Sequence, residues 1–288
     1  MKQNTQNQPL KGGLWMLLTG LCFVAVTALV KTMGSRLPAA EMAFLRYMMG
    51  LVFLLPMLGA IRRTYISTRM WGLFAARGGA HTIGVMLWFF SMTQIPLAEV
   101  TAMNYLSPVY ITLGAALFLG ERLALRRIAA VLAALIGALI ILRPGFREVS
   151  PGHIAMLFAA IAFGASYLLA KFTVDGTNPV VVVAMMSIWV TLGLAPFALA
   201  VWVTPTLTEV AVLFGVACFA TAGHYTMTLA FASAPLTVTQ PVTFLQLIWA
   251  TALGALVFSE PVDIWVVCGG GVILGAVSFI TWREAVLK

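Results

Sequence analysis

The sequence contains few charged residues. Only 9% of its 288 residues are charged, 61% are hydrophobic, and the mean hydropathy is +1.01. Water-soluble domains carry charge on about a quarter of their residues, so this chain could not cover a surface that faces water. We therefore expect the lipid bilayer to be its solvent.

Acidic residues are scarcer than basic ones, and the formal net charge is +8. A basic chain can indicate a nucleic-acid partner. Here the basic residues lie between long apolar runs and form no single patch, which is typical of topology signals in membrane proteins. We expect no nucleic-acid partner.

Residues that could support cofactor chemistry are also few. Cys22, Cys218 and Cys268 all lie inside apolar runs, and no CxxC pair or other metal-ligand spacing occurs. The sequence contains no HExxH, no GxSxG and no P-loop. It therefore predicts no metal site, no cofactor and no direct use of ATP.

Two other membrane classes fit poorly. An intramembrane enzyme would need a nucleophile–base pair or a metal cluster at depth, and neither pattern is found. A retinal-type receptor would need a lysine in the middle of a span, whereas Lys31 and Lys171 lie at span ends. We expect the protein to be neither.

Long apolar runs dominate the chain. Runs of about 20 residues, enough to cross a bilayer as a helix, number ten and cover residues 12–32, 39–60, 70–93, 97–119, 124–142, 152–171, 179–201, 208–231, 236–258 and 262–282. The first could be a signal peptide, but it has a repeat partner later in the chain. The sequence predicts an all-α integral membrane protein with ten transmembrane helices.

The ten spans form two copies of one unit. Residues 96–121 align without a gap with residues 235–260, and both segments end on an acid, Glu121 or Glu260. The first span aligns with the sixth at nearly the same offset and pairs Lys31 with Lys171. Five is an odd number, so the second copy must insert upside down relative to the first. We expect inverted five-helix repeats over residues 1–145 and 146–288.

The distribution of Lys and Arg predicts the orientation, since cytoplasmic loops carry the excess. With the N-terminus in the cytoplasm, eleven basic residues fall inside: Lys2, Lys11, Arg62, Arg63, Arg69, Arg122, Arg126, Arg127, Lys171, Arg283 and Lys288. Four fall outside: Lys31, Arg36, Arg143 and Arg147. Both termini are therefore predicted to be cytoplasmic, in a bacterial inner membrane.

The segment "NYLSPVYITLGAALFLGERL" at 104–123, with Pro108 inside the span and Gly120-Glu121 closing it, resembles the EamA family of the drug/metabolite transporter superfamily. "FLRYMMG" at 44–50 resembles the second-span arginine segment of that family. The second copy departs from the pattern, with Leu247 at the position of Pro108. The resemblance implies a central cavity between the repeats that is reached alternately from each side. In general pattern the chain also resembles amino-acid exporters of the YddG type.

Polar side chains at membrane depth are candidates for substrate contact, because burying them is costly. The candidates are His81, Arg77, Asn104, Tyr105, Tyr167, His224, Tyr225, Thr243 and Gln246. A lone His on an apolar helix is usually a packing residue. His81 and His224, however, lie on repeat-related spans and could titrate near neutral pH. Tyr167 lies near a span end, where Tyr is often an interfacial anchor.

Two arginines lie inside spans, Arg46 and Arg77. Each could be structural, for instance if Arg46 pairs with Glu41 in the same span, or could dock a substrate carboxylate. The other acids lie at span ends, so proton exchange through a mid-membrane carboxylate is not expected.

Prolines and small residues predict which helices bend and which pack. Pro108 and Pro241 free backbone carbonyls in the fourth and ninth spans, so we expect those helices to bend and line the cavity. Small residues four apart, Ala133 with Gly137 and Gly271 with Gly275, let helix backbones approach closely. We expect the fifth and tenth spans to pack away from the transport path.

Together these features predict a secondary transporter that moves small metabolites by alternating access and acts as a monomer. Export of aromatic or apolar amino acids is the favoured activity. A permease for drugs, cations or other metabolites with the same fold is the alternative, and facilitated diffusion, proton exchange and solute exchange all remain open.

Overall fold

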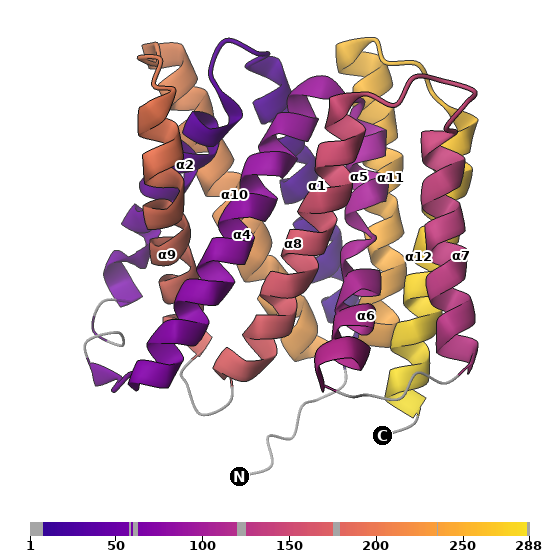
Figure 1. Cartoon of the computed structure of the whole chain (residues 1–288), viewed down its shortest axis with the longest axis horizontal. Helices are drawn as coiled ribbons and strands as arrows, with labels where there is room; N and C mark the ends of the chain where they lie inside the picture. The colour runs from indigo at the N-terminus through magenta and orange to yellow at the C-terminus, as the bar shows by residue number, and fades with distance from the viewer. Residues whose placement is uncertain are drawn as a thin grey trace.

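The structure is a computed structural model that describes residues 8–57, 59, 63–119, 125–174, 179–234 and 236–286, and these residues form a bundle of helices without a β-strand (Figure 1). The helices are α1 (Pro9–Thr32), α2 (Ala39–Gly50), the 3-10 helix η1 (Leu51–Met57), α4 (Thr68–Gln94), α5 (Leu97–Asn104), α6 (Ser107–Leu119), α7 (Leu125–Leu142), α8 (Pro151–Val174), α9 (Pro179–Ala200), α10 (Leu207–Ser233), α11 (Leu236–Phe258) and α12 (Ile264–Val286).

The helices cross the bundle in alternating directions (Figure 1). Both chain ends lie at the same end of the bundle, which we call the terminal face; the opposite end, the far face, holds the connection after α1 and that between α7 and α8. Because α1 and α8 start at opposite faces, the second set of spans is inverted relative to the first. The predicted all-α membrane fold with inverted five-helix repeats is confirmed.

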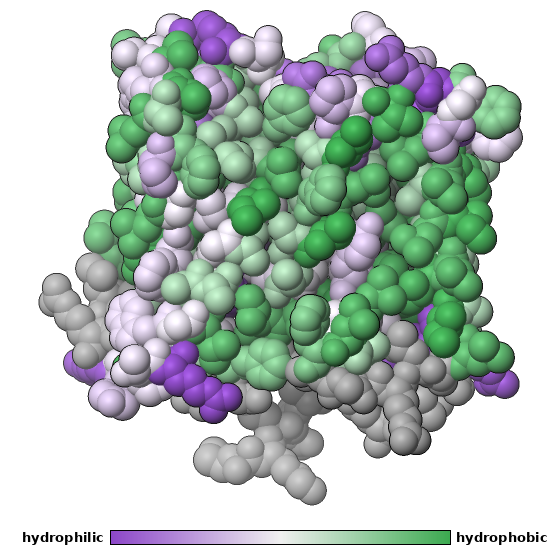
Figure 2. All heavy atoms as spheres, viewed as in Figure 1, coloured by the Kyte–Doolittle hydropathy of each residue, from purple (hydrophilic) through white to green (hydrophobic). Residues whose placement is uncertain are grey.

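The sides of the bundle are apolar. Figure 2 shows hydrophobic residues covering the middle of the visible side, with hydrophilic residues gathered toward the two ends. On α7, Leu132, Ile136 and Leu139 are exposed at helical spacing. Seven segments among the described residues are long and apolar enough to cross a membrane. Lipid, rather than water, therefore contacts these sides.

The repeats are interleaved rather than placed side by side. α1 packs along α10, and the inverted equivalents α8 and α4 pack along each other. α2 packs on its own repeat mate α9, and α7 packs on its mate α12. Such an exchange of partners is expected for two copies related by a pseudo-twofold axis in the membrane plane.

The fourth span is broken and the ninth is not. α5 ends at Asn104 and α6 begins at Ser107, directly before Pro108. A proline disfavours helical backbone in the residue before it and lacks an N–H, so it suits the first turn of a new helix. α11 is uninterrupted through Pro241, whose side chain lies outside the described residues, and has Leu247 at the position of Pro108. The backbone thus opens beside Pro108, whereas α11 continues through Pro241 without a break, although a bend was expected at both prolines.

The close contact between α7 and α12 is made by Gly137 and Gly269. A Cβ atom on Gly137 would lie 2.7 Å from the carbonyl oxygen of Gly269. The expectation that Gly275 lies at a close helix contact is therefore wrong. Gly275 is exposed and has no atom within 4 Å of its Cβ position. Six residues separate Gly275 from Gly269, or about 240° around the helix. Gly271 is half-buried, and Ala133 packs against the core from α7.

Replacing Gly137 by leucine should destabilise the bundle, because the new side chain meets backbone that cannot move aside. We expect a loss of about 1–3 kcal/mol, typical of overpacking, seen as a lower midpoint of thermal unfolding in detergent. Gly275→Leu is the matched control and should change the midpoint little, since it adds an apolar side chain to an open surface. Equal midpoints for the two variants would contradict this packing.

Candidate functional site

A cavity of about 840 Å³ lies between the two repeats. α1 contributes Met16 to Phe23, α8 contributes Phe163 to Leu168, and α12 contributes Leu274 to Thr281. The expectation that the tenth span packs away from the transport path is therefore wrong for α12. These segments lie in the middle of the bundle and in the half nearer the terminal face, as does the lining part of α6. The cavity is therefore placed toward the terminal side of the protein.

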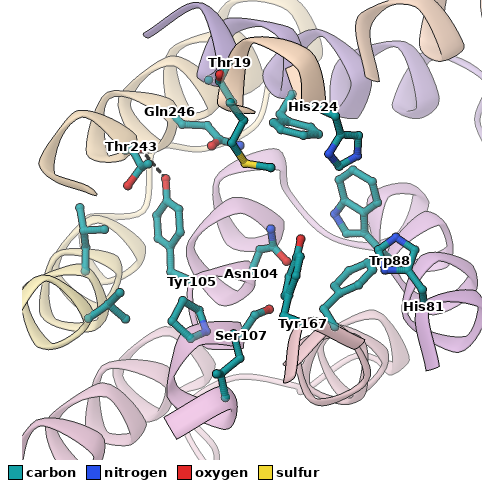
Figure 3. Close-up of a pocket in the computed structure, with 18 of the residues that line it drawn as sticks. Thr19, His81, Trp88, Asn104, Tyr105, Ser107, Tyr167, His224, Thr243 and Gln246 are labelled. Carbon is teal, nitrogen blue, oxygen red and sulfur yellow. Dashed lines mark hydrogen bonds between the residues drawn. The ribbon is translucent and has the colours of Figure 1, made fainter. Parts of the chain in front are cut away.

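Aromatic rings form much of the cavity wall. Trp88 of α4 meets Phe163 of α8 edge to face, with ring centroids 6.2 Å apart. Tyr105, Tyr167 and Trp88 all lie around the open space in Figure 3. Flat rings of this kind bind flat ligands by stacking and edge contacts, so the wall suits an aromatic solute.

Polar groups converge on the same space from the broken fourth span. Asn104 closes α5 and Ser107 opens α6, so the break presents both side chains to the cavity. The Asn104 Oδ1 and Ser107 Oγ atoms are buried and have no hydrogen-bond partner among the described residues. Buried polar atoms without partners are rare in proteins, and here they face a space that a ligand could fill.

Tyr105 links the two repeats across the cavity. Its hydroxyl donates to the backbone carbonyl of Thr243 on α11 at 2.7 Å, the dashed line in Figure 3. Gln246, one turn further along α11, and Thr19 of α1 line the same side. The Thr19 hydroxyl lies 2.9 Å from that of Thr226.

The two histidines have different surroundings. His81 uses both ring nitrogens within the protein: Nε2 lies 3.0 Å from the Tyr47 hydroxyl and Nδ1 lies 3.2 Å from the Ser166 hydroxyl. It therefore positions Tyr47 as well as lining the cavity. His224 lines the cavity from α10 and packs edge to face on Phe23, with centroids 5.2 Å apart.

The two interior arginines lie at different places. Arg46 lines the cavity, while Arg77 does not. Among the described residues, Arg77 makes one hydrogen bond, to the sulfur of Met186 at 3.4 Å. The pairing of Arg46 with Glu41 is not found. Glu41 lies in the first turn of α2, next to the connection between α9 and α10 that contains Val203. It accepts a hydrogen bond from the backbone N–H of Val203 at 2.9 Å instead.

Two of the residues predicted to line the cavity, Arg77 and Tyr225, do not line it. Tyr225 is 65% exposed and does not line the cavity. It follows His224, and consecutive helical residues point about 100° apart, so when His224 faces inward Tyr225 faces outward. Trp88 was missed, although its spacing of seven residues from His81 places it on the same face of α4.

Contacts between the repeats join the helices at the far face. Glu260, just after α11, forms an ion pair with Lys31 at the end of α1. The other oxygen of Glu260 accepts from the backbone N–H of Leu97 at 2.9 Å, which caps the start of α5. Their repeat mates, Lys171 and Glu121, lie outside the described side chains.

A second buried ionic cluster lies at the far face. Glu99, at the start of α5, accepts two hydrogen bonds from Arg147, at 2.8 and 2.9 Å. The Ser150 N–H donates to Nδ1 of His153, which leaves His153 Nε2 as the donor to Glu99 at 2.5 Å. The hydrogen bond to Glu99 raises the pKa of Arg147. This face is thus held together by ion pairs, whereas the cavity extends toward the terminal face.

Glu260→Gln should loosen the far face. Glutamine can still accept from the Leu97 N–H but cannot pair with Lys31, and a hydrogen bond to a charged group contributes about 1.5–3 kcal/mol. We expect amide hydrogen exchange of residues 95–104 to become about tenfold faster. Asp263→Asn is the control: it removes the ion pair with Arg143 at the same face and should leave exchange of α5 unchanged. Unchanged exchange in Glu260→Gln would show that the ion pair does not hold this face.

Comparisons with known proteins agree on the type of protein. The chain is 30% identical to a riboflavin transporter of Rhizobium johnstonii over 95% of its own length and 91% of that relative. It is 24% identical to an S-adenosylmethionine uptake transporter of Rickettsia prowazekii, over 96% of this chain and 94% of the relative. It is 28% identical to the pseudopaline exporter CntI of Pseudomonas aeruginosa, over 92% and 94%.

A solved crystal structure shares the fold, with a TM-score of 0.59 and 17% identity over 96% of this chain and 98% of the other. The sequence profile of the EamA-like transporter family matches twice, at residues 10–143 and 150–282. Each match covers one set of spans. The predicted resemblance is confirmed: the chain belongs to the EamA-like transporter family.

Proposed function

We propose that this protein is a secondary transporter that carries a flat aromatic metabolite of drug-like size across the bacterial inner membrane. The observation that supports this most directly is the cavity between inverted repeats, with aromatic walls and the unpartnered Asn104 and Ser107 atoms. Ligand sites commonly combine apolar walls with a few such polar groups.

The size of the cavity favours a solute larger than most amino acids. Pockets for drug-sized ligands measure about 300–1,000 Å³, and this one measures about 840 Å³. The relatives named for riboflavin and S-adenosylmethionine are named for solutes of that size range. Export of an aromatic amino acid is the second candidate, favoured by an amide and a hydroxyl beside aromatic rings.

The arrangement of the contacts supports alternating access. In the present state the far face is closed by Lys31, Glu260 and the Glu99 cluster, and the cavity lies toward the terminal face. The opposite state requires these pairs to separate while the terminal side closes. With both termini in the cytoplasm, as the Lys and Arg distribution favours, the present state faces the cytoplasm. One chain encloses the cavity, so we propose a functional monomer.

Proteoliposomes provide the test. Purified protein should carry radiolabelled riboflavin, or tryptophan for the second candidate, at rates above those of empty vesicles. Absence of flux for both, and for a wider panel of aromatic solutes, would refute an aromatic substrate class.

Trp88→Ala should weaken transport of whichever solute is carried. Loss of one aromatic contact costs about 0.5–1.5 kcal/mol beyond the lost contact area, so we expect KM to rise on the order of tenfold. Trp88→Phe should retain most of the activity. Trp282→Ala is the control, since Trp282 is exposed on α12 and outside the cavity. A rise in KM for Trp282→Ala equal to that for Trp88→Ala would contradict the assignment.

A further inference from the structure

The membrane interior of this protein holds two buried arginines without a carboxylate beside them. Arg46 is 9% exposed and Arg77 is 7% exposed. Neither forms an ion pair among the described residues, and Nε and Nη1 of Arg77 have no hydrogen-bond partner. Placing an arginine at the centre of a membrane helix costs about 2.5–3.5 kcal/mol, so both charges need an explanation.

The cavity lining carries positive charge and no described negative charge. Arg46 supplies a positive charge there, and no Asp or Glu is among the described lining residues. Glu41, the acid on the same helix as Arg46, is already bonded to the Val203 N–H. A solute that enters this space therefore meets an excess of positive potential.

Arg46 is held in place for contact. Its guanidinium lies over the ring of Tyr47, 3.9 Å from the centroid. Tyr47 is fixed by His81, and His81 in turn by Ser166, so α2, α4 and α8 all support the stack. A cation–π contact contributes about 0.5–2 kcal/mol, which offsets only part of the cost of burial. Stacking occupies a face of the guanidinium and leaves the N–H groups at its edge able to donate.

We infer that Arg46 binds an acidic group of the transported solute, a carboxylate or a phosphate. This rests on the proposed function, since it takes the cavity as the transport site. An arginine edge matches either anion with two parallel N–H···O bonds. Arg77, one turn from His81 on α4, adds to the positive potential without touching the solute. The substrate class is thereby narrowed to aromatic anions, and cationic drugs are disfavoured by repulsion.

Matched pairs of probes test the inference. Riboflavin 5′-phosphate and riboflavin share one ring system, as do indole-3-acetate and indole-3-acetamide, and only the first of each pair is an anion. Binding to purified protein in detergent is measured by flavin fluorescence and by thermal stabilisation. We expect the anion of at least one pair to bind at least tenfold more tightly than its neutral partner.

The variants identify the residue. Arg46→Gln should abolish the preference for the anion, and Arg46→Lys should keep part of it because the charge remains. Arg126→Gln, which removes an exposed arginine outside the cavity, should behave as the unaltered protein. If Arg46→Gln fails to fold, Arg46→Lys and the probe pairs on the unaltered protein still decide the question.

The outcomes separate the two proposals. Equal binding of the anion and its neutral partner in both pairs, or a preference that persists in Arg46→Gln, would overturn the role of Arg46 and leave aromatic transport standing. Failure of all four probes to bind or to be carried would overturn the aromatic substrate class and this inference with it.

Discussion

The hydrocarbon interior of a membrane cannot hydrogen-bond a protein backbone, and this constraint shapes the whole molecule. Every lipid-facing segment must satisfy its N–H and C=O groups within a helix, and irregular backbone is tolerated only where protein or a cavity surrounds it. The break between Asn104 and Ser107 obeys this rule. It lies at the cavity, in a span whose neighbours come from both repeats. The same break that would be costly against lipid exposes polar groups to the cavity.

Charge is sorted by depth according to the same constraint. At the far face, acids and bases meet in pairs: Lys31 with Glu260, Arg147 with Glu99, Arg143 with Asp263. In the proposed transport cycle, these are the contacts that separate when the far face opens. In the interior the balance differs, because no described acid lies beside Arg46 or Arg77. The paired charges thus lie at the far face, and Arg46 lies at the cavity, where, in the binding mode inferred above, a solute supplies the partner.

The sequence was sufficient for features that depend on position along the helix axis. Runs of apolar residues mark the spans, and the match between residues 96–121 and 235–260 marks the repeat, because both are properties of the chain order. The broken fourth span was also predictable, since Pro108 acts on its neighbouring residues. Asn104, Tyr105, Thr243 and Gln246 were placed at cavity depth for the same reason, and they line the cavity.

The rotation of each helix about its own axis could not be predicted from the sequence. Helices that are apolar on nearly all sides do not reveal which face meets protein and which meets lipid. Tyr225 therefore could not be distinguished from His224, nor Gly275 from Gly269, although each pair shares a helix. The partners of Glu41 and Arg46 were equally hidden. Val203 is brought to Glu41 by packing between α2 and α9, and Tyr47 contacts Arg46 by local stacking. The sequence by itself determined the depth of each residue in the membrane, the inverted repeat and the family, since hydropathy and chain order encode them. Only the tertiary structure decided which side of each helix faces the cavity, because that depends on contacts between helices far apart in the chain.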